Sequence, residues 1–310
     1  MSDTSAERYV VGLDLGGTDL KAARVMADGR LEDFRKTPSR AAESAEGPLE
    51  AIAEAVDSLS GGIRESMVGV GLGSPGVIDP GSGALAGATP HLHFWDAFPL
   101  RERLAARLGV PVSVDNDANL AALAEHRLGA ARGARVSITV TVGTGIGAGI
   151  VVDGRVMRGA RGGAGEIGHL ALGGGGAACR CGIPGCVEPE ASGSGLARQA
   201  RALGLVPAEA SSVFAAAAAG DERARALLEG MADRLGAAIG AAVNLIDPEI
   251  VVVGGGVAQA GEALMAPLRA AVNRYTLATH RQGLSVVVAA LGERAGVVGA
   301  GLMAWDAARA

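Results

Sequence analysis

The sequence predicts an α/β fold made of two related halves with a cleft between them. Three features indicate this fold. The chain opens on a pattern typical of a β-hairpin, strand-like and helix-like segments then alternate, and glycine turns recur where strand-like runs end. At 310 residues, with 49% of them hydrophobic, the chain exceeds the length at which a single core usually stops growing. We therefore expect two domains.

The strand-like segments begin near the N-terminus. Residues 9–13 are apolar and β-branched, Gly16 and Gly17 follow, and residues 20–26 form a second apolar run. This order predicts a hairpin with a glycine turn. Further apolar runs of strand length are residues 67–72, 110–114, 136–142 and 146–152.

Segments with helical spacing lie between and after these strands. Residues 49–59 and 100–108 each place their leucines near one face, so both predict packed amphipathic helices. Residues 222–246 form a long alanine-rich periodic segment that stops at Asp247-Pro248, and residues 250–253 resume as a strand. The alanine run at residues 215–219 fits either a helix or a loop.

Composition excludes several classes of partner. The net charge is −5 and there is no dense basic stretch, which disfavours a nucleic-acid surface. No apolar run reaches the roughly 18 residues needed to span a bilayer, so no membrane is expected. Residues 1–8 are polar and lack the hydrophobic core of a signal peptide, which predicts a cytoplasmic protein. The acidic net charge and the lack of a basic stretch favour small molecules as partners.

Three glycine turns are candidates for phosphate binding. In Asp14-Leu15-Gly16-Gly17-Thr18 the glycines let backbone N–H groups approach an anion and Thr18 adds a hydroxyl donor, although a plain hairpin turn explains the glycines equally well. The same combination recurs in Gly143-Thr144-Gly145-Ile146-Gly147, and Gly254-Gly255-Gly256 follows a later strand. No Gly-Lys-Ser or Gly-Lys-Thr follows and no helix opens at the first two turns, which disfavours P-loop and Rossmann sites.

Polar residues gather where the strand at residues 110–114 ends, in Asp115-Asn116-Asp117-Ala118-Asn119. Helix capping accounts for at least one of them. A kinase for a sugar hydroxyl also needs a carboxylate that accepts the proton as the oxygen attacks phosphorus, and Asp117 is the candidate base. Asp14 is the candidate that orients Mg²⁺, through water.

All three cysteines fall in one short loop, which suits metal binding better than a disulfide framework. Together with His169, Cys179, Cys181 and Cys186 complete a Cys₃His set for tetrahedral Zn²⁺. The competing interpretation is a glycine loop with incidental thiols. Four protein ligands leave no open position, so this zinc is expected to be structural.

Taken together, residues 14–18, 116–119 and 143–147, Glu166-Ile167-Gly168-His169 and the cysteine loop followed by Glu188 resemble the ROK family of sugar kinases and repressors. The resemblance runs from about Val10 to Trp305. It implies an actin-like ATPase (ribonuclease H-like) fold, with a small domain of residues 1–117 plus 297–310 and a large domain of residues 118–296 that carries the zinc loop.

The resemblance also implies the site residues. The residues that contact the hexose are Gly76, Asn116, Asp117, Glu166, His169 and Glu188, with Asp117 as the base. Those that bind ATP and its Mg²⁺ are Asp14, Gly16, Gly17, Thr18, Thr144, Gly145, Gly254, Gly255 and Gly256. An acidic residue directly after Gly-Gly-Thr repels phosphate unless it points away, so Asp19 and Lys21 are left outside the site. The plain glycine run at residues 173–176 is expected to loosen the loop before Cys179.

The expected activity is transfer of the ATP γ-phosphoryl group to a hexose, foremost to the 6-hydroxyl of glucose. A fructokinase, an N-acetylmannosamine kinase and a non-catalytic sugar sensor are the alternatives. ROK repressors carry a helix-turn-helix region ahead of this core, whereas the Asp14 motif begins almost at the N-terminus, which disfavours DNA binding. A homodimer or homotetramer is expected from the family.

Overall fold

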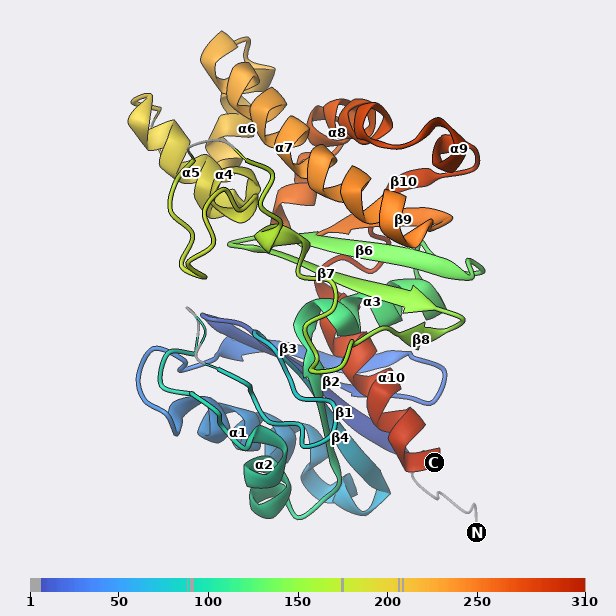
Figure 1. The fold of residues 1–310 in the computed structure, drawn as a ribbon. Helices are drawn as coiled ribbons and strands as arrows, with labels where there is room; N and C mark the ends of the chain where they lie inside the picture. Colours follow the sequence, from blue (N-terminus) through green and yellow to red (C-terminus); the bar gives the residue numbers. More distant parts are fainter. Residues whose placement is uncertain are drawn as a thin grey trace. The chain divides into compact units, whose positions relative to one another are not determined.

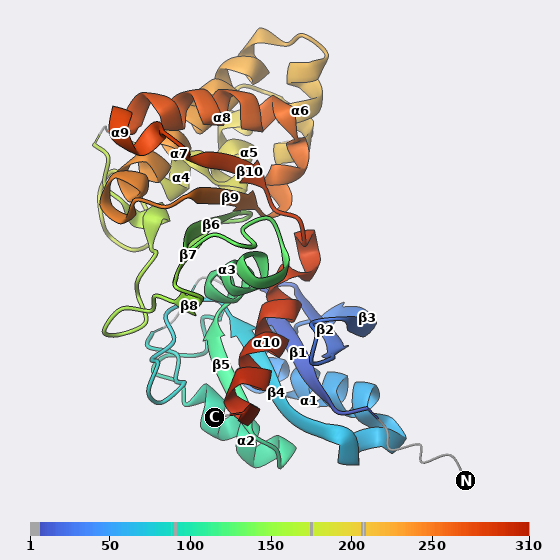
Figure 2. The same cartoon turned by 90° about the vertical axis from the view of Figure 1, so that its right-hand side faces the viewer.

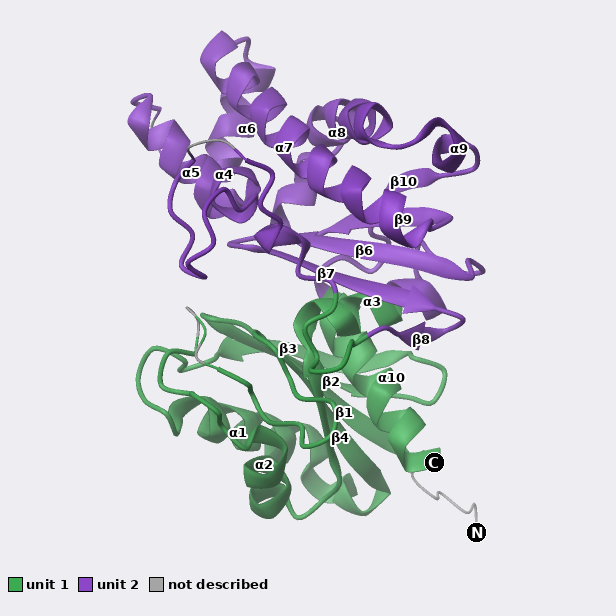
Figure 3. Cartoon of the chain, in the orientation of Figure 1, with its two compact units in different colours: residues 1–124, 158–164, 294–310 green, residues 125–157, 165–293 purple. Residues whose placement is uncertain are grey.

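The computed structural model describes residues 7–87, 89, 92–173, 176–205, 207 and 209–309. The chain divides into two compact units, shown in green and purple in Figure 3. Unit 1 comprises residues 1–124, 158–164 and 294–310, and unit 2 comprises residues 125–157 and 165–293. The sequence placed the first boundary after Asp117, while unit 1 extends through Ala124 and also takes in residues 158–164.

Unit 1 is built on a mixed sheet whose strands run in the order β3-β2-β1-β4-β5. Strand β1 pairs antiparallel with β2 and parallel with β4, β2 pairs antiparallel with β3, and β4 pairs parallel with β5. The strands are β1 (Tyr9–Leu15), β2 (Asp19–Val25), β3 (Leu31–Pro38), β4 (Met67–Ser74) and β5 (Val112–Asn116). The helices are α1 (Gly47–Ser60), η1 (Gly61–Ser66), α2 (Leu100–Leu108), the start of α3 (Asp117–Leu128) and α10 (Ala295–Arg309).

Both faces of this sheet are covered. Leu13 packs with Leu49 and Ile52 of α1 in one buried cluster, while Val10 packs with Val297 of α10 in another. Because alternate residues of a strand point to opposite faces, β1 is buried on both sides and reads as a nearly continuous apolar run. Figures 1 and 2 show α10, in red, lying along β1 and β4.

Close packing of α10 on the sheet depends on small residues. A Cβ atom at Gly71 of β4 would lie 1.9 Å from the carbonyl oxygen of Ala300, and one at Gly12 of β1 would lie 2.3 Å from that of Val297. Neither contact is sterically possible. The glycines therefore let the helix backbone rest directly on the strands.

We predict that Gly71→Ala lowers the free energy of unfolding by about 2–3 kcal/mol, because the added methyl group forces α10 away from the sheet. Urea unfolding followed by circular dichroism measures this change. Gly62→Ala is the matched control, since a Cβ there meets nothing within 4 Å. Equal stability of the two variants would show that the α10 packing is looser than described.

Unit 2 repeats the strand arrangement of unit 1, in the order β10-β9-β6-β7-β8. Strand β6 pairs antiparallel with β7 and parallel with β9, as β1 does with β2 and β4. The strands are β6 (Val136–Val142), β7 (Ile146–Val152), β8 (Arg155–Val156), β9 (Ile250–Gly254) and β10 (Ser285–Val288). The two sheets thus share one connectivity, and the predicted α/β fold of two related halves is confirmed.

The remaining helices belong to unit 2. They are η2 (Ile167–His169), α4 (Glu188–Ala191), α5 (Gly193–Ala202), α6 (Ala210–Ala218), α7 (Glu222–Ile246), η3 (Gly256–Ala260), α8 (Glu262–Tyr275), α9 (Ala278–Arg281) and η4 (Gly292–Arg294), the last of which ends at the boundary with unit 1. Helix α7 packs on α8, and its buried face joins Leu235 and Ile239 to the core under β6 and β9. Within the described ranges, no helix has the length and apolarity that crossing a membrane requires.

Candidate functional site

The predicted site residues are divided between the two units. Unit 1 holds Asp14, Gly16, Gly17, Thr18, Gly76, Asn116 and Asp117, and unit 2 holds Thr144, Gly145, Glu166, His169, Cys179, Cys181, Cys186, Glu188, Gly254, Gly255 and Gly256. In unit 1 the parallel strands β1, β4 and β5 bring the first group together. Their register places Asp14 opposite Gly73 and Gly73 opposite Asp115, so the polar residues share the carboxyl edge of the sheet.

Asn116 caps helix α3 and also holds the Gly76 turn. Its Oδ1 accepts hydrogen bonds from the backbone N–H groups of Ala118 at 2.9 Å and Asn119 at 3.1 Å, which is the capping role that the sequence left open. Its Nδ2 donates to the carbonyl oxygen of Gly76 at 3.0 Å. Gly76 has φ +92, and a Cβ there would lie 2.4 Å from Cγ2 of Thr89, so only glycine fits.

Asp117 is the first residue of α3 and is half-buried. One of its carboxylate oxygens accepts a hydrogen bond from the N–H of Ala118 at 2.8 Å. A carboxylate at a helix N-terminus interacts favourably with the unpaired N–H groups there. This location fits a carboxylate that is held in place and accepts a proton from a substrate hydroxyl.

The sequence missed the ion pair beneath this turn. Oδ2 of Asp115 lies 2.7 Å from both Nε and Nη2 of Arg158, and Oδ1 accepts from Nδ2 of Asn119 at 3.0 Å. The Asp115 side chain is only 3% exposed, so the guanidinium compensates a buried charge. Arg158 comes from the short segment 158–164 of unit 1, and no local sequence motif predicts this contact.

Asp14 has a partner that the sequence left out. Nζ of Lys21 lies 3.1 Å from Oδ2 of Asp14, its cross-strand neighbour, and the two side chains are 25% and 16% exposed. Gly296 lies against the Asp14 carboxylate, where a Cβ would be 2.6 Å from the carboxyl carbon. Asp19 instead lies 2.9 Å from Nζ of Lys36 on β3. Lys21 therefore belongs with the Asp14 group.

In unit 2 the turn between β6 and β7 meets Glu188 of α4. Oε2 of Glu188 accepts from the N–H of Ile146 at 2.9 Å, and a Cβ at Gly145 would lie 2.5 Å from the same oxygen. Gly255 has φ +85, and a Cβ there would lie 2.3 Å from the carbonyl oxygen of Val142. Two predicted nucleotide turns therefore approach the end of β6, where a predicted sugar ligand also lies.

The Cys₃His set converges as the sequence predicts. The ligand atoms of His169, Cys179, Cys181 and Cys186 all lie within 4.8 Å of one another. Sγ of Cys181 is 3.4 Å from Sγ of Cys186, and Sγ of Cys179 is 3.6 Å from Nδ1 of His169. Tetrahedral zinc separates two sulfurs by about 3.8 Å and a sulfur from a nitrogen by about 3.5 Å, so the residues fit this ion.

Metal binding in this loop is coupled to ionisation of its thiols. Burial, together with the neighbouring Cys181 and Cys179, raises the pKa of the Cys186 thiol to about 12. Thiolates are the metal-binding form, so a metal ion that binds here has to displace the proton of Cys186.

His169 faces the cluster and Glu166 at once. Its Nδ1 points to Cys179, while Nε2 lies 3.9 Å from Oε2 of Glu166. Partial desolvation raises the pKa of Glu166 from its usual value, and the negative charge of Glu188 adds to this rise. The histidine ring therefore links the cysteine loop to Glu166, one of the predicted sugar-binding carboxylates.

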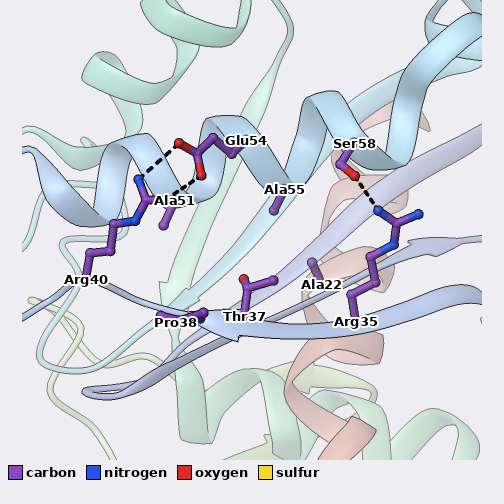
Figure 4. Close-up of a pocket in the computed structure, with 9 residues that line it drawn as sticks. All are labelled: Ala22, Arg35, Thr37, Pro38, Arg40, Ala51, Glu54, Ala55 and Ser58. Atoms are coloured by element: carbon purple, nitrogen blue, oxygen red, sulfur yellow. Dashed lines mark hydrogen bonds and ion pairs between the residues drawn. The ribbon is translucent and has the colours of Figure 1, made fainter.

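A separate hollow of about 320 Å³ lies in unit 1 between β3 and α1 (Figure 4). Its lining residues are Ala22, Arg35, Thr37, Pro38, Arg40, Ala51, Glu54, Ala55 and Ser58. None of the predicted site residues is among them. Arg40 is already paired with Glu54 at 3.0 and 2.7 Å, and Arg35 bonds Ser58 and Asp33. Both arginines that line this hollow are therefore already paired with groups of the protein.

Comparison with known proteins gives one consistent result. A family model described as the ROK family matches residues 10–307. A glucokinase of Halalkalibacterium halodurans is 38% identical over 316 residues, covering 96% of this chain and 94% of its own. An N-acetylmannosamine kinase of Citrobacter koseri is 36% identical over 301 residues, covering 95% of this chain and 98% of its own.

The fold also matches a solved structure. The crystal structure of a ROK family glucokinase from Streptomyces griseus, in complex with glucose and AMPPNP, is 34% identical in sequence. It superposes with a TM-score of 0.84, covering 95% of this chain and 98% of its own. The likeness therefore extends over both units.

Proposed function

The chain belongs to the ROK family, with its actin-like ATPase fold, and we propose that it is an ATP-dependent hexose kinase that phosphorylates the 6-hydroxyl of glucose. The observation that carries the proposal is the similarity, over nearly the whole chain, to a glucokinase whose structure holds glucose and an ATP analogue. The base, phosphate turns and sugar ligands proposed below lie in the sequence motifs that resemble this family.

In the proposed reaction, Asp117 accepts the proton of the sugar hydroxyl as its oxygen bonds to the γ-phosphorus. The bond between that phosphorus and the β–γ bridging oxygen breaks, and ADP leaves. Mg²⁺, when bound, neutralises charge on the phosphates. Asp14 would orient this ion, and the turns at residues 16–18, 144–145 and 254–256 would direct backbone and hydroxyl groups to the nucleotide.

Sugar binding is assigned to Gly76, Asn116, Asp117, Glu166, His169 and Glu188. The Asp115–Arg158 pair supports this set by holding the turn that carries Asn116 and Asp117. We further propose that a structural zinc binds Nδ1 of His169 and the thiolates of Cys179, Cys181 and Cys186. The metal leaves Nε2 of His169 to face Glu166 and a sugar hydroxyl, so it orients sugar ligands without touching the sugar.

Lys21 supports Asp14, the residue proposed to orient Mg²⁺. Because its ammonium fixes Asp14 and adds positive charge near the phosphate turn, we predict that Lys21→Met raises the KM for Mg·ATP about fivefold, equivalent to roughly 1 kcal/mol. Steady-state kinetics at saturating glucose measure it. Lys36→Met is the control, since Lys36 pairs with the exposed Asp19. Equal KM values for the two variants would remove Lys21 from the site.

N-Acetylmannosamine kinase is the second candidate, because relatives with that name are about as similar to the chain as several glucokinases. A coupled assay of ADP release at matched concentrations of glucose, mannose, fructose and N-acetylmannosamine separates the two. We expect the highest kcat/KM with glucose. If the protein binds a sugar but releases no ADP with any of the sugars tested, it is a sensor instead.

A cytoplasmic homodimer or homotetramer completes the proposal, and light scattering on the purified protein tests the assembly.

A further inference from the structure

We propose that Arg234 and Glu190 form a clamp that holds the cysteine loop in its metal-binding shape. Both are positioning residues, outside the ligand set and outside the sugar contacts. The inference rests on the proposed zinc site and adds to it the residues that keep the site assembled. The sequence predicted that the glycine run at residues 173–176 loosens the loop before Cys179, and the clamp acts on the ends of that run.

The clamp joins three segments of unit 2. Nε of Arg234, on α7, lies 3.0 Å from Oε2 of Glu190 on α4, and Nη1 of Arg234 donates to the carbonyl oxygen of Gly173 at 3.0 Å. The Arg234 and Glu190 side chains are 35% and 24% exposed, so solvent screens this pair only in part. One guanidinium thus ties α7 to both α4 and the loop.

Glu190 contacts the other end of the glycine run. A Cβ at Gly176 would lie 2.0 Å from Oε1 of Glu190, so this carboxylate packs directly on the Gly176 backbone. The backbone of Glu190 is fixed in turn, because its carbonyl oxygen accepts from Nε2 of Gln199 on α5 at 2.9 Å. The described ends of the run, Gly173 and Gly176, are therefore each held by one half of the clamp.

The held segment lies between the ligands. His169 precedes Gly173, and Cys179 follows Gly176. The far side of the cysteine loop is tied to the same segment, because the N–H of Leu172 donates to the carbonyl oxygen of Gly185, next to Cys186, at 3.1 Å. Fixing Gly173 and Gly176 therefore limits how far His169 and the cysteines can separate, which reduces the entropy lost when the metal binds.

The same clamp reaches the sugar ligand on α4. Glu188 and Glu190 share this short helix, and α4 lies beside α7 (Figure 1). A four-residue helix has little stability of its own, so its position depends on tertiary contacts such as the Arg234–Glu190 pair. Loss of the pair is expected to loosen Glu188 as well as the metal loop.

The test measures zinc release from the purified full chain. Zinc transfer to the chromogenic chelator 4-(2-pyridylazo)resorcinol is followed in the wild type, Arg234→Gln, Glu190→Gln, the double variant and Arg234→Lys. We expect release to be about 10–100-fold faster in both single Gln variants, with the double variant no faster than the worse single one. Arg234→Lys keeps the charge but not both contacts, so its release rate lies in between. The glucose KM rises in parallel.

Arg274→Gln is the matched control, because it removes an exposed ion pair between α8 and Asp233 of α7 without contacting the loop. Wild-type release rates in both Arg234→Gln and Glu190→Gln, with zinc bound at one per chain, would overturn the clamp while leaving the zinc site intact. Wild-type protein that purifies without zinc would instead refute the metal site, and with it the clamp's role toward the metal. If Arg234→Gln does not fold, the isosteric Glu190→Gln still decides between these results.

Discussion

Asp117→Asn is expected to lower kcat for glucose phosphorylation by about 10²–10⁴-fold, the usual contribution of a general base. The amide cannot accept the hydroxyl proton. The sugar oxygen must then attack phosphorus while it still carries that proton, which makes it a weaker nucleophile. Asn is isosteric with Asp and the residue begins α3 after a turn held by Asn116 and Asp115, so the fold should survive. Rates of ADP release under saturating glucose and Mg·ATP measure the loss.

Two comparisons make this result specific to the base. Glucose binding, followed by calorimetry, should weaken far less than turnover, because Asn still hydrogen-bonds a hydroxyl. Asp57→Asn is the control within unit 1, since this exposed carboxylate pairs with Arg64 on the surface. Turnover at the wild-type level in folded Asp117→Asn, on every hexose tested, would show that another group takes the proton.

Cys181→Ser is expected to release the zinc and to weaken both stability and sugar binding. Cys181 is exposed, so the substitution costs little packing and its effect reports the metal. Loss of a tightly bound ion removes several kcal/mol of stabilisation, and we expect the melting temperature to fall by about 5–10 °C. We also expect the glucose KM to rise about tenfold, because without the metal the His169 ring is no longer fixed where it faces Glu166 and the sugar.

Elemental analysis, a thermal melt and glucose kinetics on the same preparation measure these effects. Treating the wild type with a chelator should reproduce the low melting temperature, and added Zn²⁺ should restore the wild type but not the variant. A variant with one zinc per chain and unchanged stability would show that Cys181 is not a ligand. Active wild-type enzyme with only trace zinc would remove the metal from the proposal altogether.

The fold was predictable where segments are long and periodic. The bounds of β6, β7, α2 and α7 match the residue ranges expected from hydrophobic pattern and proline stops. Strand β3 was missed because an edge strand with Glu32, Asp33, Arg35 and Lys36 has no apolar alternation to read. Strand β10, with four residues, is too short for its period to be recognised.

In the candidate site, too, features that are local in the sequence could be predicted and features that depend on tertiary contacts could not. Residues that form compact motifs, such as the cysteine loop, could be proposed from their spacing, and the donor atoms of that loop and His169 converge in the fold. Arg158, Lys21, Arg234 and Glu190 were not, although each contacts a motif. Their roles come from pairs such as Arg158 with Asp115, which only the folded chain brings together. The sequence also left open which polar residue caps α3. An asparagine suits both a helix cap and a sugar ligand, so the residue type alone does not separate the two roles.

The product formed from glucose and ATP tests the proposed activity most directly. Purified protein is incubated with both substrates and Mg²⁺, ADP is quantified, and the sugar product is identified by ³¹P NMR and by oxidation with a dehydrogenase specific for glucose 6-phosphate. We predict one glucose 6-phosphate for each ADP released. Release of ADP without a phosphorylated sugar, phosphate on a different hydroxyl, or no transfer to glucose while N-acetylmannosamine is phosphorylated would contradict the proposal.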